Sequence, residues 1–393
     1  MGSEEKLLPY YDVDKTVDAA SHAALFKVLQ PPGRLFFAGV AAGWLIGMGF
    51  WLAFMTGGSL FPLRVEVVDG HPVFKHVGEV LGIKIAEEYH IDLLTISKLI
   101  IGAVFPLGLI SILLGGADLW TGNVQSVIYP YARKFIDLRG VIYNWIASYA
   151  GNFIGGLFLA FMATYGTLML VKSPFFDTMY TYAYKKSHLD AWTAFWRGVG
   201  CNILVNLAVW LYFRAKGKDM MGQAFLIWFP IFAFVAIGFE HSIANMFCIP
   251  AGIFASAYKW HVYTITYREY FFNNLLPVTY GNAVGPLILI TLYYWYVGSI
   301  KGSALGEAKP SDALKLVIDT CIIVSLIHLV LLVVIPGAIA VGVEAALGLA
   351  PGVHVDNPYI ALVPGIIASI YYIAITFIMF KVLRPYTSVK ISV

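Results

Sequence analysis

The sequence predicts an all-α membrane protein in which two halves of three helices each form an inverted repeat, followed by an extension of two helices. The first observation behind this fold class is a chain of 393 residues that is 59% hydrophobic and only 12% charged. Ordinary soluble domains carry about 25% charged residues, so the composition indicates a membrane protein. The second observation is a pair of short motifs that recur in the same order along the chain.

Eight apolar runs are long enough to cross a bilayer, since a helix needs about 20 residues to span about 30 Å of hydrocarbon. They lie at about 35–57, 97–119, 141–166, 197–213, 223–258, 275–300, 316–343 and 359–383. The mixed, charged sequence of residues 1–34 is unlike a cleaved signal peptide, so we expect it to remain as an N-terminal segment. Lys and Arg are more frequent in the loops on the side of this segment, which predicts that both termini face the cytoplasm.

The first repeated motif lies within the second and fifth apolar runs. "GADLWTGN" at 116–123 and "GFEHSIAN" at 238–245 share the pattern G-x-[DE]-x-x-x-x-N. Gly, acidic residues, Asn and Thr disfavour helix interiors and favour helix caps. We therefore expect the second and fifth spans each to be two half-helices around a loop. At membrane depth such a loop is tolerated only inside the protein or along a wet cavity.

The acidic and Asn side chains of this motif are interpreted as structural caps. On this interpretation Asp118 and Glu240 accept hydrogen bonds from backbone N–H groups that the helix breaks set free, a structural role rather than a chemical one. Asn123 and Asn245, at the last position of each motif, are expected to cap the same loops.

The second repeated motif is G-N-x-x-G-[GP], found as "GNFIGG" at 151–156 and "GNAVGP" at 281–286. Its G-x-x-x-G spacing predicts close helix packing. Because three is odd, halves at about 35–166 and 197–300 would have opposite orientations, as in the inverted repeats of transport proteins, with the functional site at the bilayer midplane. The positions after Ile300 match neither half. Residues 301–393 are therefore expected to form a transmembrane hairpin and a short cytoplasmic tail.

Several classes of function are disfavoured by the residues present. Cys201, Cys248 and Cys321 all lie in apolar runs and form no CxxC motif, so neither a disulfide framework nor a metal site is expected. The net charge of +3 is spread over the loops, which disfavours nucleic acid as a partner. A membrane enzyme or redox carrier would need paired metal or haem ligands within the spans. We expect no cofactor and no enzymatic activity.

Two of the nine histidines, His241 and His328, fall within apolar runs. A polar group in hydrocarbon is costly unless it is partnered, so each is a candidate site residue. His328 lies outside the repeat and is interpreted as a helix–helix contact. His241 follows Glu240 in a predicted helix break, and its counterpart in the first half is Leu119. It is either a histidine satisfied by backbone carbonyls or a proton donor at the midpoint of a pore.

Four stretches of the sequence resemble the formate/nitrite transporter family. "GADLWTGN", "GCNILVNLAVW", "FEHSIANMF" and "NNLLPVTYGNAVG" are similar to the signatures of that family and occur in the same order, over about residues 20–300. The resemblance implies an aquaporin-like core of six spans at 35–300, with broken second and fifth helices. It also implies a homo-pentamer in the lipid bilayer with one pore in each subunit. Aquaporin itself is disfavoured because no NPA motif occurs.

The resemblance implies roles for individual residues. His241 would be the central pore histidine, Thr121 its hydrogen-bonding neighbour and Asn202 a pore-lining residue. Lys186 matches a basic residue of the outer vestibule, with Lys185 as an alternative. The apolar constrictions match Phe105, Leu109, Leu119, Val205 and Phe234, with Trp120 where the family commonly has Phe. Without the resemblance, such apolar residues are more often packing or lipid-facing residues, and Asn202 with Asn206 could join helices by hydrogen bonds.

The expected function is proton-coupled transport of small monocarboxylates or monovalent anions such as formate, lactate, nitrite or acetate. Desolvating a carboxylate costs of order 20 kcal/mol in the ideal limit. Protonating a carboxylate of pKa about 4 at pH 7 costs only about 4 kcal/mol. The substrate is therefore expected to cross as the neutral acid beside His241, with Lys186 attracting the anion. The alternative is a passive channel for small anions or neutral solutes.

The expected location is the plasma membrane. Long loops and the added hairpin are unlike compact bacterial members of the family and favour a eukaryotic member that exports lactate or formate.

Overall fold

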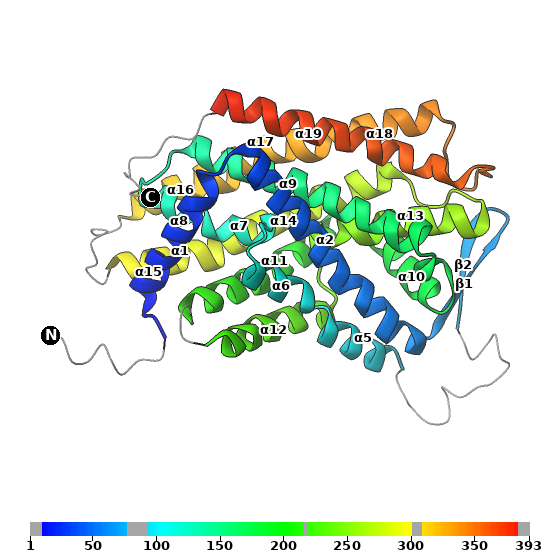
Figure 1. Ribbon diagram of the computed structural model, residues 1–393, viewed down its shortest axis with the longest axis horizontal. Helices are drawn as coiled ribbons and strands as arrows, with labels where there is room; N and C mark the ends of the chain where they lie inside the picture. The colour runs from blue at the N-terminus through cyan, green and yellow to red at the C-terminus, as the bar shows by residue number, and fades with distance from the viewer. Residues whose placement is uncertain (1–9, 77–92, 216–218, 301–308, 384–393) are drawn as a thin grey trace.

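The computed structural model describes residues 10–76, 93–215, 219–300 and 309–383. Its helices lie roughly side by side, with α1 (Val13–Val28) and α15 (Tyr293–Ile300) at one end and the strands β1 (Leu63–Val68) and β2 (His71–His76) at the other (Figure 1). We call these the α1 end and the β end. Within the described residues, 8 helical segments are long and apolar enough to cross a membrane: Pro32–Leu60, Leu93–Gly115, Leu138–Gly166, Ala191–Arg214, Met220–Ile237, Glu269–Val297, Pro310–Ala346 and Pro358–Leu383.

The predicted all-α membrane fold is confirmed, with two halves and an extension. The first half contains α1, α2 (Pro32–Gly57), α5 (Leu93–Val104), α6 (Leu107–Gly115), α7 (Trp120–Ser126), α8 (Ile128–Ala132) and α9 (Leu138–Phe161). The second half contains α10 (Phe175–Ser187), α11 (Ala191–Arg214), α12 (Met220–Ile237), α13 (Ser242–Trp260), the π-helical turn η5 (Glu269–Leu275), α14 (Leu276–Pro286), the π-helical turn η6 (Leu287–Leu292) and α15.

Both predicted helix breaks are present. Gly116 ends α6 with φ 78° and Gly238 ends α12 with φ 90°, left-handed conformations that residues other than glycine rarely adopt. The chain then runs extended through Leu119 and His241 before the second half-helix begins. The second and fifth spans are therefore discontinuous at equivalent positions of the repeat.

The predicted glycine packing is also present in both halves. A Cβ atom at Gly155 of α9 would lie 2.1 Å from the carbonyl oxygen of Val40 in α2. A Cβ atom at Gly281 of α14 would lie 2.2 Å from the carbonyl oxygen of Phe195 in α11. Such separations are well inside van der Waals contact, so each helix pair approaches too closely for any side chain at these glycines.

Aspartates begin several of the long helices. Asp137 accepts a hydrogen bond from the backbone N–H of Gly140 at the start of α9, and Asp190 accepts one from Thr193 at the start of α11. Asp219 accepts from Met221 and Gly222 at the start of α12. These N-caps satisfy backbone donors that the first turn of a helix leaves free.

A small β-hairpin, which the sequence analysis did not predict, follows α2. β1 and β2 are antiparallel, and their register pairs Leu63 with His76 and Val68 with His71. The turn between them is Asp69-Gly70, with φ 49° and 78°, and an Asp-Gly pair is a strong signal for a two-residue turn. The hairpin is joined to α10 by a hydrogen bond from the N–H of Val65 to Asp177 Oδ1.

The C-terminal extension is a helical hairpin that covers one face of the core, opposite α5 and α12 (Figure 1). Its first arm consists of α16 (Pro310–Val317), η7 (Ile318–Val324), α17 (Ser325–Leu329), η8 (Val330–Val334) and α18 (Ile335–Ala346), and its second arm is α19 (Val363–Leu383). The hydroxyls of Tyr371 and Tyr372 donate to the carbonyls of Leu331 and Leu332 and join the two arms. The predicted boundary with the core falls at residues 301–308, outside the described residues.

Candidate functional site

The two helix breaks meet near the middle of the core, and they bring Thr121 and His241 together. Thr121 lies in the first turn of α7, and His241 is the N-cap of α13. Their Oγ1 and Nε2 atoms are 3.0 Å apart, and both side chains are buried. The sequence analysis expected these two residues to be neighbours, and the structure places them so. Their role in transport stays a prediction.

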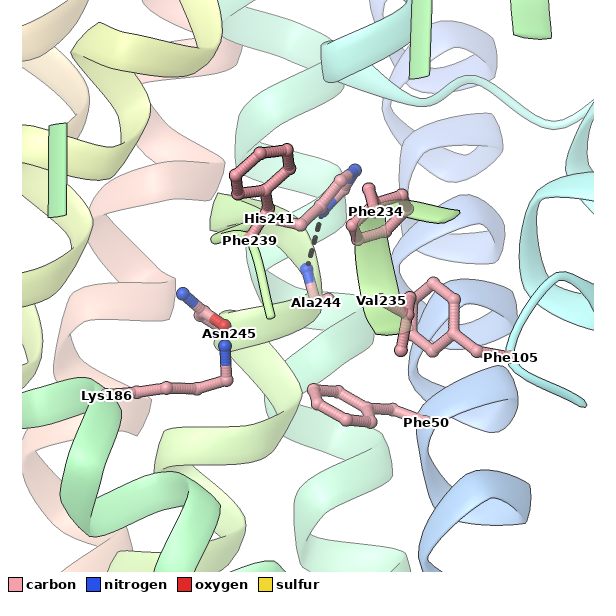
Figure 2. A pocket seen from close by; sticks show the side chains of 9 residues that line it. All are labelled: Phe50, Phe105, Lys186, Phe234, Val235, Phe239, His241, Ala244 and Asn245. Carbon is pink, nitrogen blue, oxygen red and sulfur yellow. Dashed lines mark hydrogen bonds between the residues drawn. The ribbon is translucent and has the colours of Figure 1, made fainter. Parts of the chain in front are cut away.

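The hydrogen bonds of His241 assign its tautomer. The backbone N–H of Ala244 donates to Nδ1 over 3.0 Å, so Nδ1 carries the lone pair and not a proton (Figure 2). In the neutral ring the proton then resides on Nε2, which donates to the Thr121 hydroxyl. A charged imidazolium would have to give up the bond to Ala244. The geometry therefore favours a neutral His241 that offers one N–H donor from Nε2.

Asn202 holds the first break in place and is not among the residues that line the pocket described below; its role as a pore-lining residue stays a prediction. Its Nδ2 donates to the carbonyl oxygens of Thr121 in α7 and Asn282 in α14. Asn206, one turn further along α11, also donates to the carbonyl oxygen of Thr121, over 3.0 Å. Both amides thus donate to the same backbone oxygen and hold the first turn of α7 against α11.

Two asparagines that the sequence analysis did not select support the breaks symmetrically. Asn152 of α9 accepts from the N–H of Trp120 and donates to the carbonyl oxygens of Gly39 and Asp118. Asn282 of α14 makes the equivalent set of bonds with Ser242, Gly198 and Glu240. Each belongs to the G-N-x-x-G-[GP] motif. The repetition of that Asn beside the glycines was the available signal, but the motif was interpreted as packing alone.

The acidic residues of the breaks are not backbone caps, which corrects the sequence-based interpretation. Asp118 accepts from Lys27 Nζ over 3.0 Å, and Glu240 accepts from Lys186 Nζ over 2.8 Å. Asn123 also accepts from Lys27. The backbone groups are already satisfied by the two asparagines described above, so the carboxylates are free to compensate a lysine charge. Lys27 lies in α1, within the segment that the sequence analysis treated only as an N-terminal extension.

The second ion pair is extended by amide groups. Asn245 donates to Glu240 Oε2 over 2.8 Å and to the side-chain oxygen of Asn274. Asn274 in turn donates to the carbonyl oxygen of Lys186 over 2.9 Å. This network fixes both partners of the ion pair, as a buried pair requires if it is to be stable.

Lys186 is buried and paired with Glu240, and its predicted role in the vestibule stays a prediction. It is 8% exposed, and its ammonium group also lies 5.9 Å from the centre of the Phe50 ring. Its neighbour Lys185 is exposed at the β end. Partial burial and the charge of Lys98 lower the pKa of Lys185, which indicates two like charges close together. Lys185, the alternative to Lys186 as the basic residue of the outer vestibule, is thus the more exposed of the two, and its role stays a prediction.

A pocket with about 300 Å³ of space outside the protein atoms extends from Lys186 to His241 (Figure 2). Two of the predicted constriction residues, Phe105 and Phe234, belong to its wall, and their rings are 5.6 Å apart in an edge-to-face arrangement. The Phe234 ring also lies 5.9 Å from the His241 ring. The complete lining consists of Phe50, Phe105, Lys186, Phe234, Val235, Phe239, His241, Ala244 and Asn245.

The other predicted constriction residues do not line this pocket. Leu109, Leu119 and Val205 are buried in the core, and their role as constrictions stays a prediction. Trp120, the last predicted constriction residue, contacts the C-terminal hairpin. Its ring is stacked on His328 of the hairpin at 4.8 Å and lies edge-to-face with Trp145 at 5.7 Å, so it packs between the core and the extension. The interpretation of His328 as a helix–helix contact agrees with this stack.

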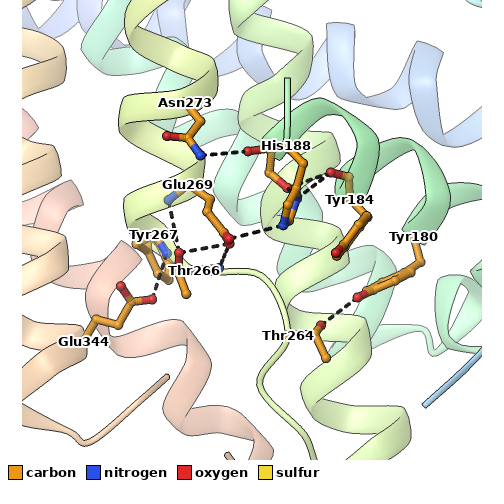
Figure 3. A network of polar contacts seen from close by, with 10 residues as sticks. Tyr180, Tyr184, His188, Thr264, Thr266, Tyr267, Glu269, Asn273 and Glu344 are labelled. Carbon is orange, nitrogen blue, oxygen red and sulfur yellow. Dashed lines mark hydrogen bonds and ion pairs between the residues drawn. The ribbon is translucent and has the colours of Figure 1, made fainter. Parts of the chain in front are cut away.

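A second polar network lies toward the β end, outside the pocket (Figure 3). His188 Nε2 lies 3.2 Å from Glu269 Oε1, and the His188 ring stacks on Tyr184 at 3.9 Å. Burial opposes a charge on His188, but the hydrogen bond and negative charge of Glu269 outweigh it and raise the pKa of His188. Glu269 is itself held by the backbone and hydroxyl of Thr266.

The site combines an aromatic wall, one imidazole N–H donor and lysine charges that are already compensated. A small molecule in the pocket would meet four phenyl rings and the polar side chains of Lys186, Asn245 and His241. A bare anion is penalised in such surroundings, whereas a neutral acid that can accept one hydrogen bond is not. Within the described ranges, no three His, Cys, Asp or Glu side chains lie close enough together to hold a metal ion.

Comparisons with known proteins agree on one family. The model of the family described as "Formate/nitrite transporter" matches residues 14–296. A "Probable formate transporter" of Methanothermobacter thermautotrophicus is 36% identical over 72% of this chain and 94% of its own length. The "Formate channel FocA" of Haemophilus influenzae is 30% identical over 72% of this chain and 93% of its own.

Solved structures give the same result. A "FNT family ion channel" has a TM-score of 0.55 and 25% identity and covers 72% of this chain and 98% of that one. A "Pentameric formate channel with formate bound" has a TM-score of 0.50 and 25% identity and covers 68% of this chain and 97% of that one.

Proposed function

The chain belongs to the formate/nitrite transporter family, and from that premise we propose that it carries a small monovalent anion together with one proton past His241. Membership of the family makes it a membrane transport protein and not an enzyme. One observation carries the proposal: a neutral imidazole, with its N–H on Nε2, closes the inner end of a pocket with phenyl walls.

The first step is the attraction of the anion to the β end. Lys98 and Lys185 place two neighbouring positive charges there, and such a field raises the local concentration of anions. Lys186, deeper in, has one N–H bound to Glu240, and an ammonium group has three donors. Its remaining donors can receive the anion at the entrance of the pocket.

The second step is neutralisation of the substrate. The aromatic wall around Phe105 and Phe234 removes water from the anion, and this raises the pKa of a carboxylic acid until it takes up a proton. Protonation costs about 4 kcal/mol for an acid of pKa about 4 at pH 7, far less than the ideal cost of about 20 kcal/mol for desolvating the anion. The neutral acid is the species that passes.

His241 acts as a hydrogen-bond donor in this scheme. Its Nε2–H can turn from the Thr121 hydroxyl to an oxygen of the substrate, while Nδ1 stays bound to Ala244. The proton that neutralises the substrate then arrives through water in the pocket. The N-terminus of α13, a helix of 19 residues, adds a positive potential that holds the substrate beside the ring until it is protonated.

The proposed substrates are small monocarboxylates and related anions. Formate is the first candidate because the relatives are formate transporters and channels, and lactate, nitrite and acetate are further candidates. The likeness to a pentameric channel supports a homo-pentamer with a pore in each subunit. We place the α1 end and both termini in the cytoplasm and the protein in the plasma membrane.

A passive channel is the second candidate, because several relatives are named as channels. The two functions differ in charge movement: symport of one anion with one proton is electrically silent, whereas an anion channel carries current.

Reconstitution in liposomes tests the proposal. The exterior of liposomes that contain the purified protein would be made acidic, and uptake of formate, lactate and nitrite would be measured first with the membrane potential held at zero and then with an imposed potential. We expect uptake above the external concentration, proportional to the pH gradient and unchanged by an imposed potential. Uptake that follows the potential and ignores the pH gradient would establish the channel instead.

A further inference from the structure

His328 of the C-terminal hairpin contacts the helix break of the core through Trp120. The two rings are stacked at 4.8 Å with an interplanar angle of 13°. Tyr149 and Trp145 of α9 meet the same imidazole edge-to-face at 4.7 Å and 5.7 Å. His328 is 2% exposed, and neither of its ring nitrogens has a hydrogen-bond partner among the residues that the structure describes. A buried imidazole without a polar partner contributes here through its planar ring.

Trp120 is the residue directly before Thr121. Its backbone N–H is held by Asn152, and its indole ring fills the space between α9 and α17. Thr121 continues the same turn, and its hydroxyl lies 3.0 Å from His241 Nε2. The contacts therefore run from the hairpin to the proposed transport site in three steps: His328 to Trp120, Trp120 to Thr121, and Thr121 to His241.

The hairpin is attached to the core on both sides of this stack. Toward the α1 end, Asp319 accepts a hydrogen bond from the hydroxyl of Tyr131 at the end of the broken second span. Toward the β end, Glu344 accepts from the N–H of Tyr267 over 2.8 Å (Figure 3). It also accepts from the hydroxyl of Tyr263. Together with the stack on Trp120, the contacts of Asp319 and Glu344 attach the hairpin to the core at three levels along its length. They keep α17 at a fixed distance from the helix break of the second span.

The backbone adds a further attachment at the β end. Tyr263 donates to the carbonyl oxygen of Val353 over 2.9 Å and accepts from Gly352 over 2.8 Å. These bonds join the loop that follows α13 to the loop between the two arms of the hairpin. The hairpin also lies outside the residues matched by the family model, which end at 296. The contact between His328 and Trp120 is thus formed by a part of the chain outside the shared core.

We propose that His328 is a positioning residue of the transport site: its ring holds the Trp120 indole, and through it the Thr121 hydroxyl, in the orientation that meets His241. The hairpin then contributes to transport and does not only pack against one face of the core. The inference rests on the proposed role of the Thr121–His241 pair in transport. Small displacements of positioned groups can lower rates by as much as about 100-fold. Loss of the stack between His328 and Trp120 is therefore expected to lower the transport rate measurably.

Formate uptake by full-length protein in liposomes tests the proposal with two substitutions at one position. H328F keeps a planar ring and should retain uptake within about twofold, since the nitrogens make no bond that Phe would lose. H328L removes the flat face and should lower the maximal rate by roughly 10- to 100-fold. Leu326→Ala, on an exposed face of the same helix, is the matched control and should leave uptake unchanged. Size-exclusion chromatography would establish that each variant assembles.

A double-mutant cycle distinguishes positioning from general damage. If His328 acts through Thr121, H328L should cause no further loss in a protein that already carries T121A, because the hydroxyl to be positioned is gone. A merely structural role would lower uptake by the same factor in both backgrounds, and that result would overturn the inference. Wild-type uptake by an assembled H328L protein would overturn it as well.

The same assay separates this inference from the proposed function. If His241→Ala abolishes uptake while assembled H328L transports normally, the proposed function stands and the role of His328 is rejected. If His241→Ala transports normally, the proposed function fails, and with it the premise on which the role of His328 depends.

Discussion

The two helix breaks share one scaffold. Each begins at a left-handed glycine, Gly116 in the first half and Gly238 in the second. In each, one asparagine from a neighbouring helix, Asn152 or Asn282, binds backbone groups on both sides of the break. In each, a carboxylate pairs with a lysine from the short helix that begins its half. These repeated features satisfy polar groups that a break would otherwise leave unpaired in the membrane.

The breaks differ where leucine in the first half corresponds to histidine in the second. Leu119 precedes α7 and makes no side-chain cap, whereas His241 precedes α13 and faces the pocket. The same replacement occurs two residues after each paired lysine: Leu29 ends α1, whereas His188 ends α10 and pairs with a carboxylate. The repeated residues therefore hold the fold, while the residues that differ between the halves carry the groups able to bind or move protons.

The largest expected effect comes from restoring the symmetry at His241. His241→Leu makes the second break resemble the first and removes the Nε2–H donor, so we expect proton-coupled formate uptake to fall by about 100-fold or more. Ser242→Ala is the control: its hydroxyl is buried and unpartnered among the described residues, so removing it should cost little. Uptake in liposomes, with assembly checked by size-exclusion chromatography, is the measurement. Undiminished coupled uptake by assembled His241→Leu would remove the imidazole from the mechanism.

The next effect, smaller than the loss of uptake, is on the free energy of unfolding, and it should distinguish the two ion pairs. The side chain of Lys186 is 11% exposed and that of Lys27 is 27% exposed. Glu240→Ala leaves a deeply buried charge uncompensated and should cost about 3–5 kcal/mol of stability. Asp118→Ala should cost less, because Lys27 can reach water. Thermal unfolding of the purified protein in detergent measures both changes.

Removal of both partners provides the control for this prediction. Lys186→Met combined with Glu240→Leu leaves no unpaired charge and should recover most of the stability lost in Glu240→Ala. Equal losses in Glu240→Ala and Asp118→Ala would show that burial does not distinguish the pairs.

The smallest expected effect is a pH dependence of stability from His188. Its pKa is raised in the folded protein, so its contribution is fully present below the unfolded value of about 6.5 and is lost as pH rises through the higher folded pKa. The side chain is 33% exposed, so solvent screening limits the contribution to less than about 1 kcal/mol. Melting temperature against pH should therefore decline above pH about 6.5 in the wild type.

His188→Gln should flatten this decline, because the residue can no longer be charged. An unchanged pH profile in His188→Gln would mean that other groups are responsible. The first half, with Leu29 at the equivalent position, has no corresponding group at the end of α1.

Much of the fold followed from the sequence. The eight spans, the breaks after Gly116 and Gly238 and the close packing at Gly155 and Gly281 were all predicted, because each depends on local residue type and spacing. The β1–β2 hairpin was missed although Asp69-Gly70 signalled its turn. The pairing of Thr121 with His241 was expected only from the resemblance to a family, since the two residues lie in different halves of the chain.

Residue type and spacing are enough to predict which polar residues fall within the apolar spans and where the helices break, because hydrophobicity and backbone preference belong to each residue and its neighbours in the chain. The partners of these groups could not be predicted from the sequence and follow from the packing of the helices: Lys27 for Asp118, Lys186 for Glu240, and His328 for Trp120. Each pair joins segments far apart in the chain. A buried charge or ring takes whichever partner the packing of the helices brings within a few ångströms, and that choice is made in three dimensions.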